Sequence, residues 1–387
     1  GSFLHNIKNT LNLLTGSKNI LDLDKKRRLG SDFTFRDTKE WIPVEGAPAA
    51  LSLACGGLSN IWGESGYPLA EEDFSNWPIN NNDMEPHYTA AAKILSIRQA
   101  TDHLADIFPI YGGDTDLPEH SEVSKYLLKH WNENSENILS QGITFGRSRI
   151  AMRLRDTENG LGCVRCGMCH TGCAYDSIYR SNWTLNELMK YNKFRYLTPW
   201  WLQKFEEQGD SVRIHLINKN TRIKECLTYD ALFLAAGTIS TFRIVAESQQ
   251  LYNMPVELFD NDLYLLPFFR RPIANETITR TGITLNELVL RFKSLGYPLH
   301  LQFYPMNAQI YDRFQEIIKI NSKFAKKMSE KVFSKILLAF VYLPGEVSAK
   351  MKIEVGKSSS GTSIIIKQNR HPNSRSIIRK SIWHLYR

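Results

Sequence analysis

The sequence lacks a long hydrophobic run. Its longest apolar stretch, Ile336 to Leu343, is much shorter than the roughly 20 residues that a helix needs to cross a bilayer. The first residues also lack the charged segment and the apolar segment that together mark a secretion signal. We therefore expect no membrane span and a cytoplasmic location.

The sequence also lacks basic motifs interleaved with aromatic residues, and it lacks zinc-finger spacing. Its formal net charge is +8, from 48 basic and 40 acidic residues, and much of the excess lies in Lys319 to Lys335 and Arg370 to Arg387. A surplus of this kind most often forms a solvated surface. We therefore expect no nucleic-acid partner.

Cysteine is scarce, but its distribution is uneven. The chain has six cysteines, and four of them fall within one short run at Cys163, Cys166, Cys169 and Cys173. The spacing C-x2-C-x2-C-x3-C matches the ligand run of bacterial ferredoxins, whose thiolates bind an iron-sulfur cluster. Without a secretion signal, closely spaced cysteines also favour a reducing compartment.

This run has four interpretations. The first is an iron-sulfur cluster, with Cys55 or Cys226 as a candidate for a further ligand because one run usually gives three ligands to one cluster. The second is a tight loop whose thiols pack without metal. A structural zinc fits less well, because zinc sites usually separate two C-x2-C pairs more widely. Disulfides are the fourth alternative, and the close spacing leaves little room for their geometry.

Glycine is concentrated at residues 54–68, A-C-G-G-L-S-N-I-W-G-E-S-G-Y-P. Gly56, Gly57 and Gly63 allow the backbone amides to approach a flat or anionic group closely. The alternative is a set of ordinary tight turns, in which Asn60 bonds to the local backbone.

A third feature lies at residues 229–248, Y-D-A-L-F-L-A-A-G-T-I-S-T-F-R-I-V-A-E-S. The apolar run from Tyr229 to Ala235 predicts a strand, Gly237 interrupts it, and Thr238 to Ser248 has helical spacing. A strand followed by a small-residue turn and a helix N-terminus can present amides to a phosphate or a ring edge. The same pattern also fits any strand-to-helix joint of an α/β protein.

These three features, in this order, resemble the glucose-methanol-choline (GMC) family of FAD-dependent oxidoreductases over about residues 45–270. The stretch G-G-L-S-N-I-W-G resembles the family's flavin-covering loop. The cysteine run resembles an insert of a bacterial subset, some of whose members hold an iron-sulfur cluster. The stretch L-A-A-G-T-I-S-T-F-R at Leu234 to Arg243 resembles the later FAD-contacting strand and helix.

The resemblance implies FAD as cofactor and an alcohol or sugar dehydrogenase that transfers hydride from the alcohol carbon to the flavin. It implies that the cofactor is bound by Gly56, Gly57, Ser59, Asn60, Trp62, Gly63, Ala236 and Gly237. It implies an iron-sulfur cluster at Cys163, Cys166, Cys169 and Cys173 that relays electrons to an acceptor protein.

The sequence departs from the family at both ends. It contains no G-x-G-x-x-G fingerprint to hold the FAD pyrophosphate, so we expect the chain to begin after it. It also lacks the family's catalytic histidine segment, and neither His371 nor His384 matches it. The catalytic residues are therefore unassigned, and the alternative function is a non-catalytic iron-sulfur or metal-binding module, or an inactive flavoenzyme fragment.

The predicted fold class is mixed α/β. Residues 1–270 are predicted to form a partial, Rossmann-like FAD-binding domain with the cysteine insert at about 155–180, and residues 271–387 a partial substrate domain built on an antiparallel sheet with helices. Within these parts we expect helices at Asp83 to Leu95, Ser121 to Trp131 and Leu285 to Lys293, strands at Val212 to Ile217 and His300 to Tyr304, and capping boxes in the two T-L-N-E-L copies at Thr184 and Thr284.

Overall fold

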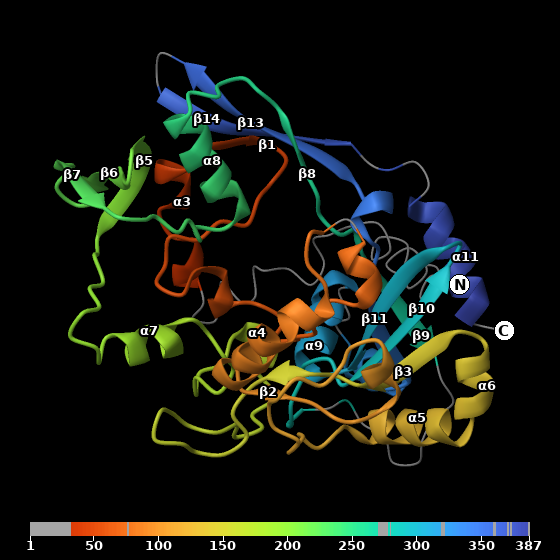
Figure 1. The fold of residues 1–387 in the computed structure, drawn as a ribbon. Helices are drawn as coiled ribbons and strands as arrows, with labels where there is room; N and C mark the ends of the chain where they lie inside the picture. The colour runs from red at the N-terminus through yellow and green to blue at the C-terminus, as the bar shows by residue number, and fades with distance from the viewer. Residues whose placement is uncertain are drawn as a thin grey trace.

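The computed structural model describes residues 32–75, 77–269, 278, 280–318, 322–358, 361–369, 371 and 374–385. Within them both helices and strands occur, and the predicted mixed α/β class is confirmed (Figure 1). The α-helices are α3 (Thr38–Trp41), α4 (Asn81–Ile94), α5 (Glu122–Glu133), α6 (Ser135–Ser140), α7 (Asn182–Leu188), α8 (Thr238–Ser248), α9 (Ala308–Ile318), α10 (Lys323–Phe333) and α11 (Ser374–Leu385).

The strands form four sheets. They are β1 (Val44–Gly46), β2 (Ile97–Arg98), β3 (Ile143–Arg147), β4 (Ile150–Ala151), β5 (Trp200–Gln208), β6 (Ser211–Asn218), β7 (Lys224–Tyr229), β8 (Val256–Leu258), β9 (Leu263–Phe269), β10 (Leu288–Ser294), β11 (Tyr297–Pro305), β12 (Ile336–Tyr342), β13 (Lys350–Ser358) and β14 (Gly361–Asn369). Short 3-10 turns include η2 (Asp32–Phe35), η3 (Gly57–Asn60) and η6 (Cys169–Thr171).

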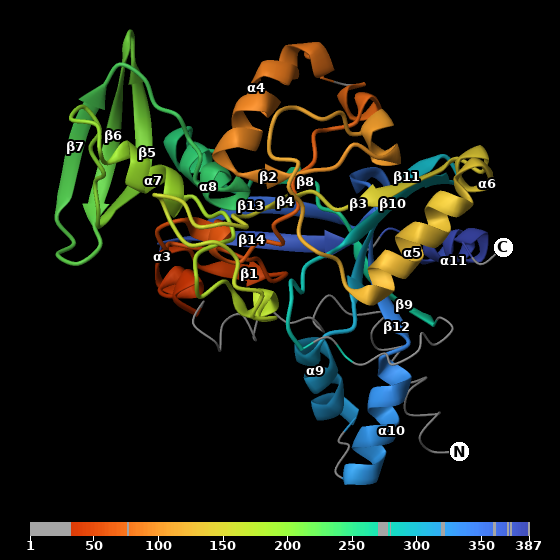
Figure 2. The same cartoon turned by 90° about the horizontal axis from the view of Figure 1, so that it is seen from below.

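The largest sheet has the order β3-β10-β11-β12-β9, and all of its pairings are antiparallel. Side chains alternate across its two faces, so each face needs its own cover. One face packs on Val123 of α5 and on Ile377 and Ile378 of α11. The other packs on residues of α9 and α10, including Phe314 and Phe333 (Figure 2). This part is an antiparallel sheet with helices on both faces.

A second sheet has the order β1-β14-β13-β8, in which β1 and β14 run parallel and the other pairs are antiparallel. It shares a hydrophobic cluster with α8 and with the segment that leads to the glycine-rich loop. Both this sheet and the largest one combine strands from either side of residue 270, so the two predicted parts are interleaved. The division at residue 270 and the Rossmann-like assignment stay predictions.

Three further strands, β5, β6 and β7, form an antiparallel meander at one edge of the molecule (Figure 1). Helix α8 packs against it: the Arg243 guanidinium donates to the carbonyl oxygens of Leu202 (2.8 Å) and Gln203 (3.2 Å), and Phe205 N donates to Ser248 Oγ (2.9 Å). No helix among the described residues is long and apolar enough to cross a membrane.

Several local predictions are confirmed. Helices α4 and α5 lie where the helical patterns placed them, and α8 has the predicted bounds Thr238–Ser248. Strands β6 and β11 contain the predicted strands Val212 to Ile217 and His300 to Tyr304.

Others are wrong. Leu285 to Lys293 is largely strand β10, not helix. Leu288 to Leu290 are consecutive apolar residues of an interior strand buried on both faces, so they lack the alternation that marks a half-exposed strand. The predicted strand Tyr229 to Ala235 stops at Tyr229, where β7 ends, and 231–235 are not assigned to a strand.

Neither T-L-N-E-L copy forms a capping box. Thr184 lies inside α7, which begins at Asn182, and Thr284 lies just before β10. Its hydroxyl lies 3.4 Å from the carbonyl oxygen of Gly167, and Glu287 instead binds Ser121. The same five letters therefore occupy different structures, which excludes an internal repeat.

Candidate functional site

The glycine-rich loop turns sharply at two left-handed residues, Gly56 (φ 88°) and Gly57 (φ 54°), before η3. Ser59 and Asn60 close the turn on itself. Ser59 Oγ donates to Gly56 O (2.5 Å), and Asn60 Nδ2 donates to Cys55 O (3.0 Å) and Gly57 O (2.8 Å). The positive φ angles explain the glycines, and the local bonds explain why serine and asparagine follow them.

The loop is also fixed from outside by the segment that follows the cysteine run. Ser181 Oγ lies 2.7 Å from Ser59 Oγ, and Trp62 Nε1 donates to Tyr179 O (2.7 Å). A Cβ atom at Gly56 would lie only 2.3 Å from Asn182 Oδ1. Two motifs that are more than a hundred residues apart in sequence are thus in direct contact.

Two amide oxygens at this junction have unmet hydrogen-bonding capacity. Asn60 Oδ1 and Asn182 Oδ1 are both buried, and neither has a hydrogen-bond donor among the described residues. A Cβ atom at Gly56 would lie 2.3 Å from Asn182 Oδ1 and 3.0 Å from Asn60 Oδ1, so the two oxygens face each other across this glycine. Both oxygens are enclosed by protein, so their unmet capacity lies inside the junction and not on an open surface.

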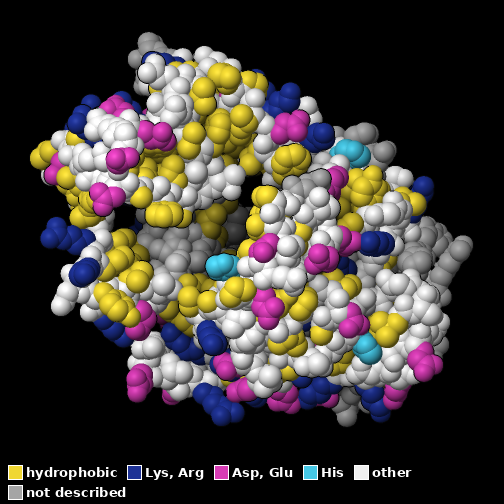
Figure 3. Space-filling model, viewed as in Figure 1, with side chains coloured by type: hydrophobic (Ala, Val, Ile, Leu, Met, Phe, Trp, Pro, Cys, Tyr) yellow, Lys and Arg dark blue, Asp and Glu magenta, His cyan; other side chains and the backbone are white. Residues whose placement is uncertain are grey.

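The other predicted cofactor residues, Ala236 and Gly237, lie at the start of α8. Gly237 has φ 82°, and no side chain caps the helix at this position. Beside it is an open pocket of about 630 Å³, lined by Leu234, Ala235, Gly237, Thr238, Thr241, Phe242 and Val245. Figure 3 shows a hollow on this face of the molecule with hydrophobic side chains along its edge. A pocket of this size accepts a ring system.

The structure brings these two elements into one region. Leu51 and Leu53, which precede the glycine-rich loop, share a hydrophobic cluster with Ile239 and Phe242 of α8. The loop itself does not line the α8 pocket, whose walls come from residues 234–245. The two backbone elements therefore lie near one another, each with its own open surface.

The four clustered cysteines have different environments, and all are free thiols. Cys166 is exposed, Cys169 is buried, and Cys163 and Cys173 are intermediate. Burial raises the pKa of the Cys169 thiol to about 12, and burial also raises the pKa of Cys163. Over the described part of the chain, no group of three or more His, Cys, Asp or Glu side chains is placed to hold a metal ion. The donors as arranged do not fit a cluster.

Instead, the cysteine loop packs as a structural element. Gly167 N donates to Gly282 O (3.0 Å), and Gly282 N donates to Arg165 O (2.7 Å). A Cβ atom at Gly167 would lie 2.5 Å from Arg280 O, so only glycine allows this approach. Cys163, Cys169 and Cys173 belong to a hydrophobic cluster with residues such as Ile283 and Leu285.

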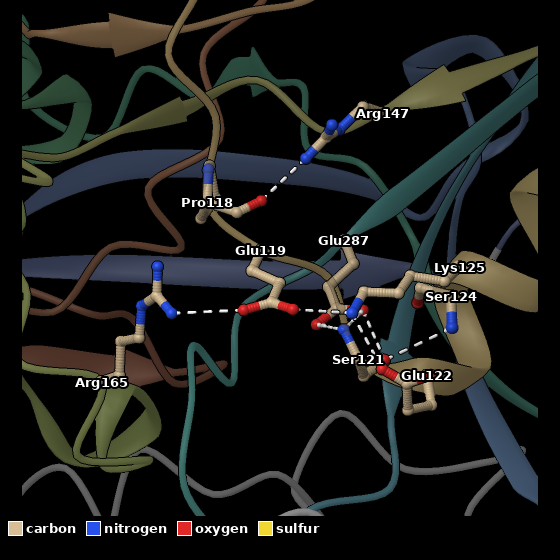
Figure 4. A network of polar contacts seen from close by, with 9 residues as sticks. All are labelled: Pro118, Glu119, Ser121, Glu122, Ser124, Lys125, Arg147, Arg165 and Glu287. Carbon is tan, nitrogen blue, oxygen red and sulfur yellow. Dashed lines mark hydrogen bonds and ion pairs between the residues drawn. The ribbon is translucent and has the colours of Figure 1, made fainter.

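A polar network links the cysteine loop to the start of α5 (Figure 4). Glu119 accepts from Lys125 (2.7 Å) and lies 3.3 Å from Arg165 Nη1, and these two cations lower the pKa of its carboxyl. Glu287 accepts from the Ser121 hydroxyl (2.6 Å) and backbone amide (3.0 Å), while burial raises its pKa. Sequence reasoning missed this network because its members come from separate segments.

A second buried network, also missed from the sequence, joins the end of the glycine-rich loop to the largest sheet. Ser65 Oγ donates to Asn286 Oδ1 (2.7 Å), Asn286 Nδ2 donates to Ser148 Oγ (2.5 Å), and Tyr67 OH lies 3.2 Å from Ser148 Oγ. Burial raises the pKa of Tyr67. The network fixes the orientation of the loop relative to the sheet.

Comparison with protein-family models finds no match for this chain, and comparison with curated proteins finds none either. The resemblance to the GMC family rests on the residues quoted from the sequence.

Proposed function

We propose that this chain is a FAD-dependent oxidoreductase acting on CH–OH groups, with an alcohol or a sugar as its small-molecule substrate. The observation that supports the proposal is that the segment leading into the glycine-rich loop (Leu51 and Leu53) and the first turns of α8 (Ile239 and Phe242) share one hydrophobic cluster. Both elements carry the motifs on which the resemblance rests.

The residues present fit a flat cofactor. A Cβ atom added at Gly57, Gly63 or Gly237 would meet no atom within 4 Å, so the backbone at these three positions faces open space. The first amides of α8 have no side-chain cap, and such amides favour an anion or an electronegative ring edge.

FAD, when bound, would supply the hydride acceptor. The residues of this chain would bind and orient it: Gly57 and Gly63 by close backbone approach, Ala236 and Gly237 through the amides at the start of α8. Trp62, held by Tyr179 O, would cover apolar surface beside the loop. The catalytic base is assigned to no residue.

The experiment is flavin binding by the full chain. We expect the purified protein to bind FAD, detected by its visible absorption or by quenching of flavin fluorescence. Gly57→Val and Gly237→Val should each weaken binding by about tenfold, which is about 1.4 kcal/mol, because a side chain would occupy the open space.

Gly209→Val is the matched control. Gly209 also has a positive φ (61°) and open space at its Cβ position, but it lies in the hairpin between β5 and β6. It should leave FAD affinity unchanged. Failure of the wild-type chain to bind FAD, or equal weakening by all three substitutions, would contradict the proposal.

The iron-sulfur cluster stays a prediction from the spacing, and no electron-transfer step is built on it. If the cluster forms on metal loading, Cys166→Ser should lower the iron content of anaerobically purified protein. Val164→Ser, at an exposed position of the same cysteine run that offers no thiol, is the control. Iron that is absent from wild type, or unchanged in Cys166→Ser, would favour the packed loop that the structure describes.

A further inference from the structure

The outer face of the β5-β6-β7 sheet carries a cysteine, a histidine and a glutamate in a row. Cys226 Sγ lies 3.4 Å from His215 Nδ1, and His215 Nε2 lies 3.0 Å from Glu206 Oε1. The three residues come from three different strands, β7, β6 and β5. Cys226 is exposed, and the His215 side chain is 25% exposed.

The register of the sheet creates this row. Cys226 is directly opposite His215 in the β6–β7 pairing, so their side chains project from the same face. The opposite face of β6 carries Val212, Ile214 and Leu216, which are all buried. A slip of one residue would expose these three side chains, so their burial fixes the register and with it the Cys226–His215 contact.

The contacts match the roles of an activated nucleophile. A thiol needs a neighbouring base to become a thiolate, and the base is oriented when a third group engages its other nitrogen. Here His215 Nδ1 faces the thiol, and Nε2 faces a carboxylate. Lys204, opposite His215 in the β5–β6 pairing, donates to the same Glu206 oxygen (2.7 Å) and holds the carboxylate in place.

We propose that Cys226 is a site of reversible mixed-disulfide formation with low-molecular-weight disulfides. His215 Nδ1 accepts the thiol proton, and the Cys226 sulfur attacks one sulfur of the disulfide in line with the S–S bond. A new S–S bond forms to Cys226 and the old one breaks. The other half leaves as a thiolate, so one disulfide is exchanged for another and no further oxidant is required.

Two other cysteines are built-in references. Cys55 and Cys166 are also exposed. Cys55 lies beside the phenol of Tyr196, and a phenol does not accept a thiol proton at neutral pH as an imidazole does. Differences in rate between Cys226 and Cys55 in one sample therefore report the local chemistry and not the reagent concentration.

The test exposes the native full chain to oxidised glutathione at one neutral pH and follows each cysteine by mass spectrometry of its peptide. We expect Cys226 to react about tenfold or more faster than Cys55, within the range that a positioned general base supplies. His215→Gln should remove most of this advantage, and Glu206→Gln should remove part of it. The rate at Cys55 should stay the same in both variants.

Arg213→Gln is the matched control variant. Arg213 lies on the same strand and face as His215, two residues away and opposite Glu206, and Arg213→Gln changes a nearby basic side chain without removing the proton acceptor. It should leave the rate at Cys226 within about twofold of wild type, since charges exposed to solvent are weakly coupled.

A wild-type measurement needs no variant to fold. In guanidinium-unfolded chain, Cys226 and Cys55 should react at similar rates, because the strand pairing that places His215 is lost. Equal rates in the native chain, or a native advantage that survives His215→Gln, would overturn the proposal. The outcome does not depend on FAD binding, so it is independent of the proposed function.

Discussion

At the scale of single residues, His300 shows how burial sets a protonation state. It lies on β11, packed among the rings of Tyr67, Phe108 and Tyr342. Desolvation and, to a smaller extent, the nearby Arg291 together lower the pKa of its imidazole from 6.5 to about 3. Between pH 6.5 and about 3, the imidazole of His300 is therefore neutral in the folded protein, whereas it becomes protonated in the unfolded chain.

This predicts a loss of stability in mild acid. The unfolded state takes up the proton below pH 6.5 and the folded state does not, so the stability that His300 supports is present above that pH and is lost as the pH falls toward 3. Between pH 7 and pH 5 the wild type should lose about 2 kcal/mol from this group, at about 1.4 kcal/mol for each unit below 6.5. Urea unfolding at both pH values measures it.

His300→Gln should be less stable than wild type at pH 7 and should show a smaller loss on acidification. His87→Gln, which removes an exposed histidine on α4, controls for the loss of one histidine. A wild-type pH dependence that His300→Gln leaves unchanged would contradict the buried, neutral imidazole.

The sequence predicts the conformation of single residues well where local backbone geometry alone determines the residue type. Gly56, Gly57 and Gly237 were expected at turns, and all three have positive φ. It does not predict contacts that need the sheet register. Nothing in the sequence places Cys226 beside His215, because their proximity depends on the pairing of two strands.

At the scale of elements, strand β10 is an interior strand of the largest sheet. Its neighbours are β3 and β11, and six of its seven residues are buried. In contrast, the turn between β10 and β11 exposes Leu295, whose φ is positive. The hairpin formed by β10 and β11 therefore contains leucine both at buried strand positions and at an exposed turn position.

We predict that Leu290→Ala, at a position only 7% exposed, lowers the free energy of unfolding by about 3 kcal/mol through lost burial and a residual cavity. Leu295→Ala, at a position 55% exposed in the adjoining turn, should change it by less than about 0.5 kcal/mol. Chemical denaturation of both variants measures the difference. Similar losses in the two would mean that β10 is not a buried central strand.

Helical elements with a clear apolar stripe were predictable, and α8 was found with its expected bounds. Strand β10 was not, because its first residues, Leu288 to Leu290, are continuously apolar and lack the alternation that identifies a strand. The prediction of a strand after Tyr229 was wrong for the opposite reason. Its apolar residues suggested a strand, but Phe233 is 92% exposed and 231–235 pair with no described strand.

At the scale of the whole molecule, the mixed class and the antiparallel, helix-covered sheet followed from the sequence. The long-range pairings did not. Strand β1 pairs with β14, and β3 pairs with β10, across separations that local patterns do not encode. The contact between the glycine-rich loop and Ser181 likewise joins residues that are 122 positions apart in the sequence.

The parallel pairing of Val44–Gly46 with Ile364–Ile366 joins a segment near the start of the chain to one near its end. A single backbone cut in the exposed hairpin between β6 and β7 would leave two polypeptides whose interlocked strands keep them together. The nicked molecule would migrate as one particle under native conditions and as two bands in detergent.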